Sequence, residues 1–375
     1  MTAGPLAGIR IIEVCHMLAG PYCGMLLADL GAEVIKIENG DGDIARRTGS
    51  HSVGAHNVYF ASLNRNKKSI LLDLKHPSDR RRFEELVAVS DALITNLRPQ
   101  AIRSLGLTYE ALRHVNERIV CVALTGFGLN GPFSEYPAYD YIIQAMTGVM
   151  MLTGRPDAPP ERAGYSIADN TGGMTAAIGL LAKIIEGRGG QVDVALYDTL
   201  LSQLNYLAGM YLTTGEHPER MPDGAHPFFV PAQIFRTRDG HMALFITHDS
   251  FWRIFAERIG RPDWIRDPAF ATMEARSRNR ERVLTEIQGE LVKKTSDEWV
   301  DLFRPEGVVV AAIGTMADAL GQEHTAARNM IVSIPTDAGM LRLVGNPIKI
   351  VGMTESFRPP PLLGEHEIPR ERLRP

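Results

Sequence analysis

At 375 residues with 45% hydrophobic side chains, the chain is long enough to bury a large core, and its length indicates two domains. Its formal net charge of -4 excludes a global attraction to nucleic acid or to anionic membranes, so a phosphate-bearing ligand needs a local basic cluster. The cysteines, Cys15, Cys23 and Cys121, lie in apolar stretches and are too few for a disulfide framework, which indicates buried thiols in a reducing compartment.

The sequence carries no recognisable address to a membrane or to the secretory route. Met1–Pro5 lacks the charged flank and the apolar run of a signal peptide, and no stretch of about 18 apolar residues follows in the chain. We therefore expect a cytoplasmic protein that binds neither membrane nor nucleic acid.

The first two hundred residues alternate strand-like and helix-like segments. Apolar runs predict the strands, and segments with one apolar face predict the helices between them. We expect strands at 9–14, 33–38, 69–74, 92–95 and 119–125, and helices at 20–30, 78–90 and 176–185. Such alternation implies a mainly parallel sheet, which binds ligands in the loops beyond the carboxyl ends of its strands.

The pattern changes at about Thr213, where a proline-rich passage is typical of a linker. Residues 234–238 and 241–246 flank Asp239-Gly240 and predict a hairpin, and helices dense in Arg and Glu follow from 250 to about 303. The expected organisation is a large α/β domain over 1–212, a linker over 213–230, a smaller α+β domain over 231–325, and a segment, 326–375, that returns to the large domain.

Two kinds of phosphate site are considered. A nicotinamide-binding unit needs G-x-G-x-x-G after its first strand, but the turn at Leu18–Gly24 lacks this fingerprint, so a dehydrogenase is disfavoured. Asn64–Lys68 and Lys75 form a basic cluster around one short strand that could hold a diphosphate. A solvated charge run beside a strand explains the same residues equally well.

Asp169 lies just before the expected helix 176–185, and Gly172 and Gly173 stand between them. The helix dipole and free N–H groups are expected to keep its carboxylate ionised, and the glycines to leave it open to a ligand. An ionised, accessible carboxylate can act as a covalent nucleophile. From position alone, however, an aspartate here is more commonly a simple helix N-cap.

Other catalytic signatures are absent from the sequence. It contains no G-x-S-x-G, no Walker loop, no H-E-x-x-H and no metal-ligand spacing of His and Cys, so no metal is expected. His16 follows Cys15, but neighbours on a strand point to opposite faces, so a thiol–imidazole pair is not expected either.

Eight segments in order span almost the whole chain, from residue 5 to residue 366. They are Leu18–Pro21, Leu27–Glu38, Leu63–Ile70, Thr125–Gly128, Tyr139-Asp140, Ile167–Met174, Gly190–Val194 and Leu363–His366. Each segment alone is weak, but together they resemble the class III CoA-transferases, the CaiB/BaiF family that includes formyl-CoA transferase and carnitine CoA-transferase.

The resemblance implies a Rossmann-like large domain built from both ends of the chain, a smaller domain inserted between them, and an intertwined homodimer. It also implies that Asp169 is the nucleophile. CoA would pass from an acyl-CoA to a carboxylic acid acceptor through a mixed anhydride and an aspartyl-CoA thioester on this residue. CoA would be a substrate, and no further cofactor is implied.

The family's contacts to CoA, carried onto this sequence, fall in the first domain. They are His16, Met17, Asn39, Leu72, Lys75, Asn96, Leu97, Arg98, Arg103 and Tyr139. Among these, Lys75, Arg98 and Arg103 are the candidate partners of the phosphates. Many members have Arg directly before Leu-Gly-Leu, where this chain has Ser104, and its arginine lies one residue earlier at Arg103.

Further departures concern the acceptor pocket. Leu18 and Asn39 stand where the formyl-CoA and oxalate members have Gln and Arg, and Pro222–Ala225 stands where they have a run of glycines. Oxalate is therefore not the expected acceptor, and the pocket near the reacting carbon is expected to be less polar. His226 and Phe228 are candidates for its lining.

Two other functions remain open. An α-methylacyl-CoA racemase shares the fold and the aspartate, but it needs a second proton carrier, which that family supplies as His in Gly-His-Asp. Ala138-Tyr139-Asp140 offers a tyrosine instead, and its ordinary pKa of about 10 makes it a poor base at neutral pH, so transfer is favoured. A CoA-ester-binding protein without catalysis is the third possibility, and the presence of Asp169 gives it no support.

Overall fold

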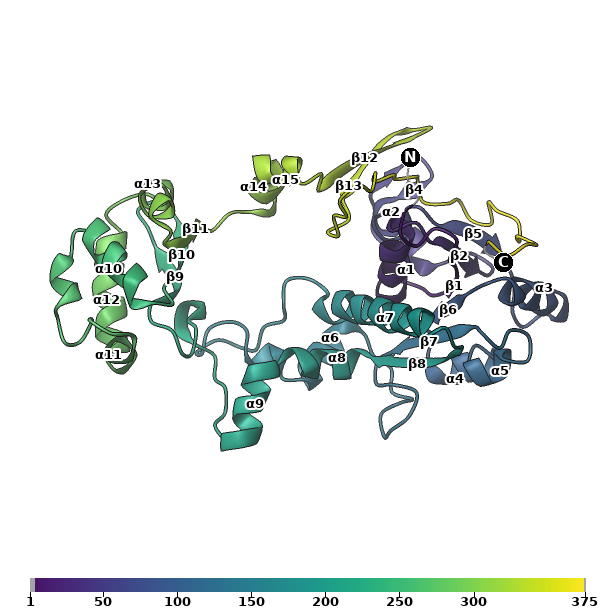
Figure 1. The fold of residues 1–375 in the computed structure, drawn as a ribbon, viewed down its shortest axis with the longest axis horizontal. Helices are drawn as coiled ribbons and strands as arrows, with labels where there is room; N and C mark the ends of the chain where they lie inside the picture. The colour runs from purple at the N-terminus through teal and green to yellow at the C-terminus, as the bar shows by residue number, and fades with distance from the viewer. Residues whose placement is uncertain (1–3, 374–375) are drawn as a thin grey trace. The chain divides into compact units, whose positions relative to one another are not determined.

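The computed structural model describes residues 4–373, which form two compact units (Figure 1). The first unit consists of the chain up to Val149, Arg162–Glu216, and the chain from Glu323 onward. The second unit consists of Met150–Glu161 and His217–Gln322.

The domain boundaries differ from those expected from the sequence. In that expectation, residues 150–161 belong to the first domain and the second domain starts at residue 231. Residues 150–161 group with the second unit because they bind its proline-rich segment. Arg220 Nη1 donates to the carbonyl oxygens of Ala158 and Pro159, at 2.8 and 3.0 Å. These contacts to main-chain carbonyls leave no periodic signal in the sequence.

A six-stranded parallel sheet forms the centre of the first unit, in the order β5-β2-β1-β6-β7-β8. The strands are β1 (Arg10–Val14), β2 (Glu33–Glu38), β5 (Lys68–Leu71), β6 (Ala92–Thr95), β7 (Val120–Thr125) and β8 (Gly190–Ala195). The predicted α/β fold with a parallel sheet is confirmed. Because the strand order reverses between β1 and β6, the loops after these two strands diverge and open a crevice at the carboxyl edge.

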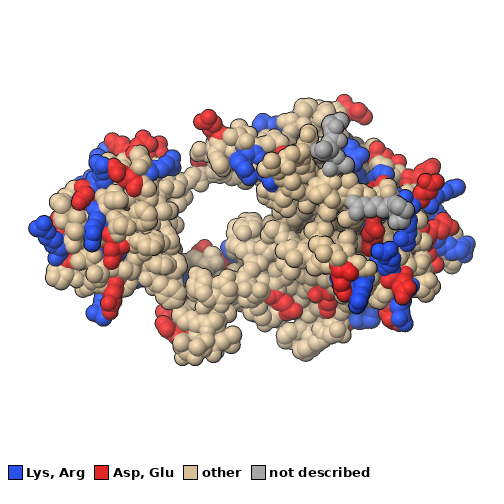
Figure 2. Space-filling view, in the orientation of Figure 1, with Lys and Arg blue, Asp and Glu red and all other residues tan. Residues whose placement is uncertain are grey.

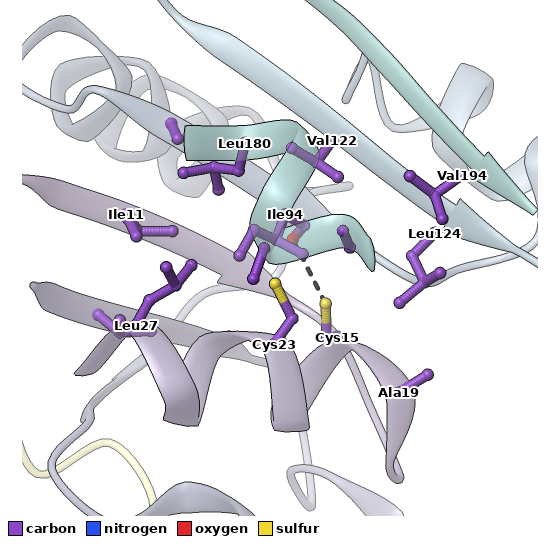
Figure 3. Packing of buried hydrophobic residues seen from close by; sticks show 14 of the residues in the cluster. Ile11, Cys15, Ala19, Cys23, Leu27, Ile94, Val122, Leu124, Leu180 and Val194 are labelled. Carbon is purple, nitrogen blue, oxygen red and sulfur yellow. Dashed lines mark hydrogen bonds between the residues drawn. The ribbon is translucent and has the colours of Figure 1, made fainter. Parts of the chain in front are cut away.

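Helices cover both faces of this sheet. Alternate residues of each strand supply the two cores: Ile11 and Val122 pack with α1 and α7 (Figure 3), whereas Ile12 and Cys121 pack with α3 and α4. The helices of this unit are α1 (Ala19–Asp29), α2 (Val58–Asn64), α3 (Pro77–Ala88), α4 (Pro99–Ser104), α5 (Tyr109–Leu112), α6 (Asp140–Met146), α7 (Ile167–Glu186), α8 (Leu196–Gln203), α9 (Asn205–Thr214), and the short 3-10 helix η1 (Ile44–Arg47).

Two glycines allow α7 to pack closely on its neighbours. A Cβ on Gly173 would lie 2.7 Å from the carbonyl oxygen of Ala19 on α1, and a Cβ on Gly172 would lie 2.3 Å from Leu196 Cδ2 on α8. The expectation that these glycines serve to expose Asp169 is wrong, because the space that their missing side chains leave is filled by α1 and α8.

The chain from Glu323 returns to the first unit. Its elements are α15 (Glu323–Ala327), β12 (Ile331–Thr336) and β13 (Gly339–Val344), and a smaller pair is formed by β3 (Ser52–Val53) and β4 (His56–Asn57). The β12–β13 hairpin packs its apolar face on α2. Further on, the N–H of His366 donates to the carbonyl oxygen of Ser69, so the tail covers the edge strand β5.

Arg65, Lys67 and Lys68, beside and on β5, are ion-paired, so they form neither the predicted phosphate cluster nor a solvated charge run. Lys75, the other cation of the predicted cluster, is exposed. The pairs are Arg65 Nη2 to Asp29 Oδ2 at 2.6 Å, Lys67 Nζ to Glu13 Oε2 at 2.7 Å, and Lys68 Nζ to Glu33 Oε1 at 2.5 Å. Arg65 and Lys67 are buried, so their charges are neutralised by the fold and are not available to a ligand.

The second unit is the smaller α+β domain that the sequence predicts. Its elements are β9 (Ala232–Arg236), β10 (His241–Phe245), β11 (Val309–Ala312), α10 (Asp249–Arg258), α11 (Met273–Arg278), α12 (Arg280–Leu291), α13 (Ser296–Phe303), α14 (Met316–Gly321), and the 3-10 helices η3 (Pro222–Gly224), η4 (Pro262–Ile265) and η5 (Arg304–Glu306). The predicted hairpin is β9–β10, the antiparallel sheet has the order β11-β10-β9, and the rings of Trp252, Trp264 and Phe270 stack in the core.

Replacing Gly173 by Ala is expected to destabilise the protein by about 1–3 kcal/mol, because the added methyl group meets the α1 backbone. The matched control is Gly289→Ala in α12, where nothing lies within 4 Å of the added Cβ, and where alanine's higher helix propensity favours the variant. Urea unfolding of both variants measures the difference. Equal stabilities would contradict the close α1–α7 packing.

Candidate active site

A cavity of about 210 Å³ lies at the carboxyl edge of the sheet, where the strand order reverses. Its lining comes from the loops after β1, β6 and β7, together with Tyr139 and Asp169 at the starts of α6 and α7. These segments are far apart in the sequence and meet here because parallel strands all end at one edge.

A second cavity, of about 160 Å³, shares His16 and Leu97 with the first. Asn39, Leu72 and Lys75, from the segments that follow β2 and β5, also line it. The two cavities together contain all of the predicted CoA contacts except Arg103. The proposed ligand site therefore extends from Lys75, past His16, to Asp169.

Arg103 lies outside both cavities. It is on the exposed side of α4 and forms an ion pair with Glu135. Among the described residues, Lys75 and Arg98 are the Lys and Arg side chains that line the two cavities, so the position of Arg103 does not support its expected contact with a phosphate.

Asp169 lies in the first turn of α7, two residues after its first residue, Ile167, and its side chain lines the first cavity. Burial raises the pKa of the Asp169 carboxyl to about 7, and the negative charge of Asp140 adds to the shift. The expectation that the helix dipole keeps this group firmly ionised is wrong, because desolvation at this position outweighs the partial charge of the helix terminus. Near neutral pH the carboxyl is present in both forms.

Asp140 is a second acidic residue of the site, and the sequence analysis assigned it no role. It is buried at the start of α6, where its carboxylate accepts hydrogen bonds from the N–H of Ala168 and from Gln144 Nε2, both at 2.7 Å. It thereby fixes the start of α7 and places a negative charge near Asp169. Its occurrence in the Tyr139-Asp140 motif was the available signal.

The environments of Cys15 and His16 exclude a nucleophile–base pair. Cys15 is buried in the core, its thiol donates to the carbonyl oxygen of Ile94 at 3.4 Å, and burial raises its pKa well above the ordinary value. His16 lies in the cavities, and burial lowers its pKa, so the imidazole is neutral at pH 7. His16 can therefore contact a ligand but adds no positive charge.

The side chain of Asn96 has a role that the sequence does not reveal. Its Oδ1 accepts from the N–H of His16 at 2.9 Å, and its Nδ2 donates to the carbonyl oxygen of His16 at 2.8 Å. Asn96 lines the cavity, but both ends of its amide are engaged in holding the loop after β1.

Tyr139 is 65% exposed and lines the same cavity as Asp169. His226 and Phe228, the candidates for the acceptor pocket, belong to the second unit, where their rings contact each other.

Within residues 4–373 no group of three or more His, Cys, Asp or Glu side chains is arranged to hold a metal ion. In the same described range, no helix has the length and apolar character needed to cross a bilayer.

The raised pKa of Asp169 predicts a pH-dependent stability difference between the protein and its Asp169→Asn variant. An aspartate has a pKa of about 3.9 when unfolded, so this group favours the folded state below pH 4, and the advantage is lost as pH rises through about 7. The neutral variant should therefore melt several degrees higher than the parent at pH 8, with the difference shrinking towards pH 4. Melting curves that run parallel across this range would contradict the burial of the charge.

Comparison with known proteins shows the family of the chain. Over 363 residues the chain is 36% identical to the acetyl-CoA:oxalate CoA-transferase of Acetobacter aceti, which covers 95% of this chain and 92% of the relative. It is 33% identical over 377 residues to the succinate–glutarate CoA-transferase of Agrobacterium fabrum, covering 97% and 94%. A CaiB/BaiF family protein from Brucella suis, known as a crystal structure, superposes with a TM-score of 0.85 at 32% identity, covering 97% and 98% of the two chains.

The sequence profile described as CoA-transferase family III matches residues 6–367. The match covers both ends of the chain and everything between them, as the eight motifs predict. The chain belongs to CoA-transferase family III and is an enzyme of this class.

Proposed function

We propose that the enzyme transfers CoA from an acyl-CoA thioester to a short free carboxylic acid through covalent intermediates on Asp169. The supporting observation is the position of this carboxyl group in a cavity at the carboxyl edge of the sheet. Among residues 4–373, no hydrogen-bond donor reaches the Asp169 carboxylate, so its oxygens are available to a substrate.

In the proposed reaction, a carboxylate oxygen of Asp169 attacks the thioester carbonyl, the C–S bond breaks, and CoA leaves as the thiolate. The thiolate then attacks the aspartyl carbonyl of the mixed anhydride, which releases the donor acid and leaves an aspartyl-CoA thioester. The acceptor carboxylate repeats the two steps in reverse order and leaves as the new CoA ester. Each step exchanges one acyl bond for another of similar energy, which is the advantage of covalent catalysis.

The raised pKa of Asp169 suits this role. A carboxylate that is poorly solvated in the empty cavity gains stability when it becomes a neutral anhydride or thioester, so burial favours the covalent intermediates. The protonated form cannot attack, so the first-step rate is expected to increase with pH through about 7.

The start of α1 is a candidate site for stabilising the negative charge that develops on the thioester oxygen. Leu18 and Ala19 line the cavity with Asp169, and no side chain caps this helix end. The first N–H groups of a helix have no partner within it, so they can donate to an oxyanion. CoA would extend from here into the second cavity, with Lys75 as a partner for its phosphates.

The acceptor class follows from size and charge. A cavity of about 210 Å³ suits a short acid, and Arg98 is the cationic side chain that lines it within the described residues. The two relatives named above act, by their names, on acids with two carboxylates. We therefore propose a short dicarboxylate larger than oxalate, since Leu18 makes the pocket less polar at the reacting carbon.

Exposed apolar side chains support the proposal of an intertwined homodimer. None of the 10 residues of α9 is buried, and Leu212 on it is 81% exposed, as are Ile178 and Ile185 on α7 at 69% and 84%. An apolar helix that buries none of its residues within its own chain is stabilised by another surface.

The three buried free thiols support a reducing compartment, and hence the cytoplasm.

Asp169→Asn and Asp169→Ala are expected to reduce CoA transfer at least about 1,000-fold, because neither side chain can form the anhydride. Asp193→Asn is the matched control: burial also raises the pKa of this carboxyl, but it lies on β8 and binds the N–H of Leu129. Transfer is measured by mass spectrometry of the CoA esters formed from acetyl- or succinyl-CoA and a panel of acids. Full activity of Asp169→Asn would reject the mechanism.

Isotopes distinguish transfer from racemisation. When the acceptor acid carries ¹⁸O in its carboxylate, one labelled oxygen should remain on Asp169 after the first turnover and leave with the donor acid of the next. In deuterated buffer the new ester should contain no deuterium at its α-carbon. Deuterium entering a 2-methylacyl-CoA without formation of a new ester would instead establish the racemase.

The dimer is tested by light scattering. The protein should have twice its chain mass of 41.3 kDa, and Leu212→Glu should weaken the association, whereas Arg81→Glu on the exposed side of α3 should leave it unchanged. A monomer that retains full transfer activity would contradict the proposed assembly.

A further inference from the structure

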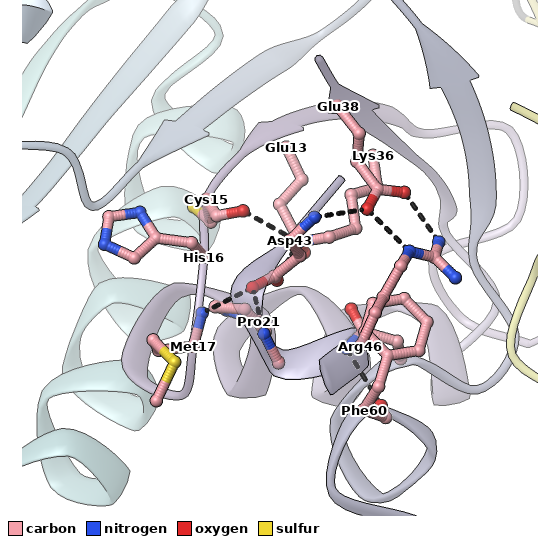
Figure 4. A network of polar contacts seen from close by, with 12 residues as sticks. Glu13, Cys15, His16, Met17, Pro21, Lys36, Glu38, Asp43, Arg46 and Phe60 are labelled. Atoms are coloured by element: carbon pink, nitrogen blue, oxygen red, sulfur yellow. Dashed lines mark hydrogen bonds and ion pairs between the residues drawn. The ribbon is translucent and has the colours of Figure 1, made fainter. Parts of the chain in front are cut away.

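Side chains from other segments hold the loop between β1 and α1 at each of three successive residues. Figure 4 shows those that hold Cys15 and Met17. The carbonyl oxygen of Cys15 accepts from Lys36 Nζ at 2.8 Å, and both backbone groups of His16 bind Asn96. The N–H of the next residue, Met17, donates to Asp43, so each of these three residues has a backbone group bound by a side chain from another segment.

Met17 has an unusual backbone conformation. Its φ is 62°, in the left-handed region that side-chain-bearing residues seldom adopt. Its N–H donates to Asp43 Oδ1 at 3.1 Å, and the same oxygen accepts from the N–H of Ala45 at 2.9 Å. The hydrogen bond to Asp43 is thus the contact that compensates for the conformational preference of Met17.

Asp43 is itself fixed by a buried charge. Its Oδ2 lies 2.9 Å from Lys36 Nζ, as an ion pair and not as a directed hydrogen bond, and Lys36 Nζ also pairs with Glu13 Oε1 at 3.0 Å. The side chains of all three residues are inaccessible to solvent. A buried pair of this kind has few alternative geometries, so it holds the Asp43 carboxylate in one orientation.

The conformation of Met17 determines where α1 starts. Leu18 and Ala19 follow it directly and line the Asp169 cavity, and their N–H groups are those proposed to stabilise the thioester oxyanion. An extended conformation at residue 17 would turn this end of the helix away from the cavity. The catalytic geometry therefore depends on Asp43, which lines the neighbouring cavity and lies in none of the sequence motifs.

We propose that Asp43, oriented by Lys36, is a positioning residue for CoA transfer, which holds Met17 in the left-handed conformation so that the first N–H groups of α1 face Asp169. This inference rests on the proposed function. The effect of Asp43 is expected on the stabilisation of the transition state more than on the binding of CoA, because the positioned N–H groups bind charge that develops during the reaction.

The test is a double-mutant cycle between Asp43→Ala and Met17→Gly, with kcat and KM for the acyl-CoA and the melting temperature measured for each. Asp43→Ala alone should lower kcat by about 10-fold to 100-fold and change KM for the acyl-CoA by less than about threefold, because misplaced groups lose rate more than binding. Glycine adopts a positive φ without strain, so in the Met17→Gly background the same Asp43→Ala change should cost at least about threefold less in kcat.

The matched control is Asp91→Ala. Asp91 Oδ2 accepts the N–H of Arg10 at 2.8 Å, so it performs the same kind of backbone contact at the opposite end of β1. This variant should lose stability without a fall in kcat. If Asp43→Ala does not fold, Asp43→Leu takes its place in the cycle, since leucine is similar in size but has no oxygen to accept the N–H of Met17.

Strictly additive effects of the two substitutions on kcat would overturn the proposal, and so would a loss of melting temperature with kcat unchanged. Asp169→Asn in the same assay separates the two hypotheses. Full transfer by that variant rejects the Asp169 mechanism, whereas the coupling between Asp43 and Met17 reports only on how the loop is positioned.

Discussion

The first unit depends on a neutral group of buried charges beneath the carboxyl ends of its central strands. Glu13 on β1 pairs with Lys36 on β2 and with Lys67 before β5, and Lys36 also pairs with Asp43. Two carboxylates thus balance two ammonium groups away from water. Burial alone would lower the pKa of Lys36, but the adjacent carboxylates outweigh it and raise the pKa above its ordinary value.

Unpaired buried charges cost several kcal/mol, so these segments are stable only when all of them are assembled. The same group contacts the loop that leads into α1, through Lys36 at Cys15 and Asp43 at Met17 (Figure 4). The side chains that neutralise each other in the core therefore also determine the shape of the cavity. The space-filling view shows charged side chains of both signs on the visible surface of each unit (Figure 2).

The chemistry at Asp169 results from a competition between two local effects. A helix N-terminus favours a carboxylate, whereas burial and the neighbouring Asp140 favour the protonated form, and the second effect is larger here. Asp169 lowers the stability of the protein, since an ionised buried carboxylate destabilises the folded state. Active sites commonly retain such destabilising groups, because the same environment that strains the free enzyme favours its reaction.

The sequence by itself determined the alternation of strands and helices, the parallel sheet, the smaller α+β domain and the family, because periodicity and short motifs are local properties. Through the family resemblance it also indicated Asp169 and nine of the residues that line the two cavities, because short motifs can be matched without knowing the fold. The tertiary structure alone decided that Arg65 and Lys67 are internal ion pairs, that Arg103 pairs with Glu135, and that Gly172 and Gly173 accommodate helix packing. It also decided the protonation of Asp169. Charge pairing and desolvation depend on atoms contributed by distant segments, and no local pattern in a sequence records which segments those are.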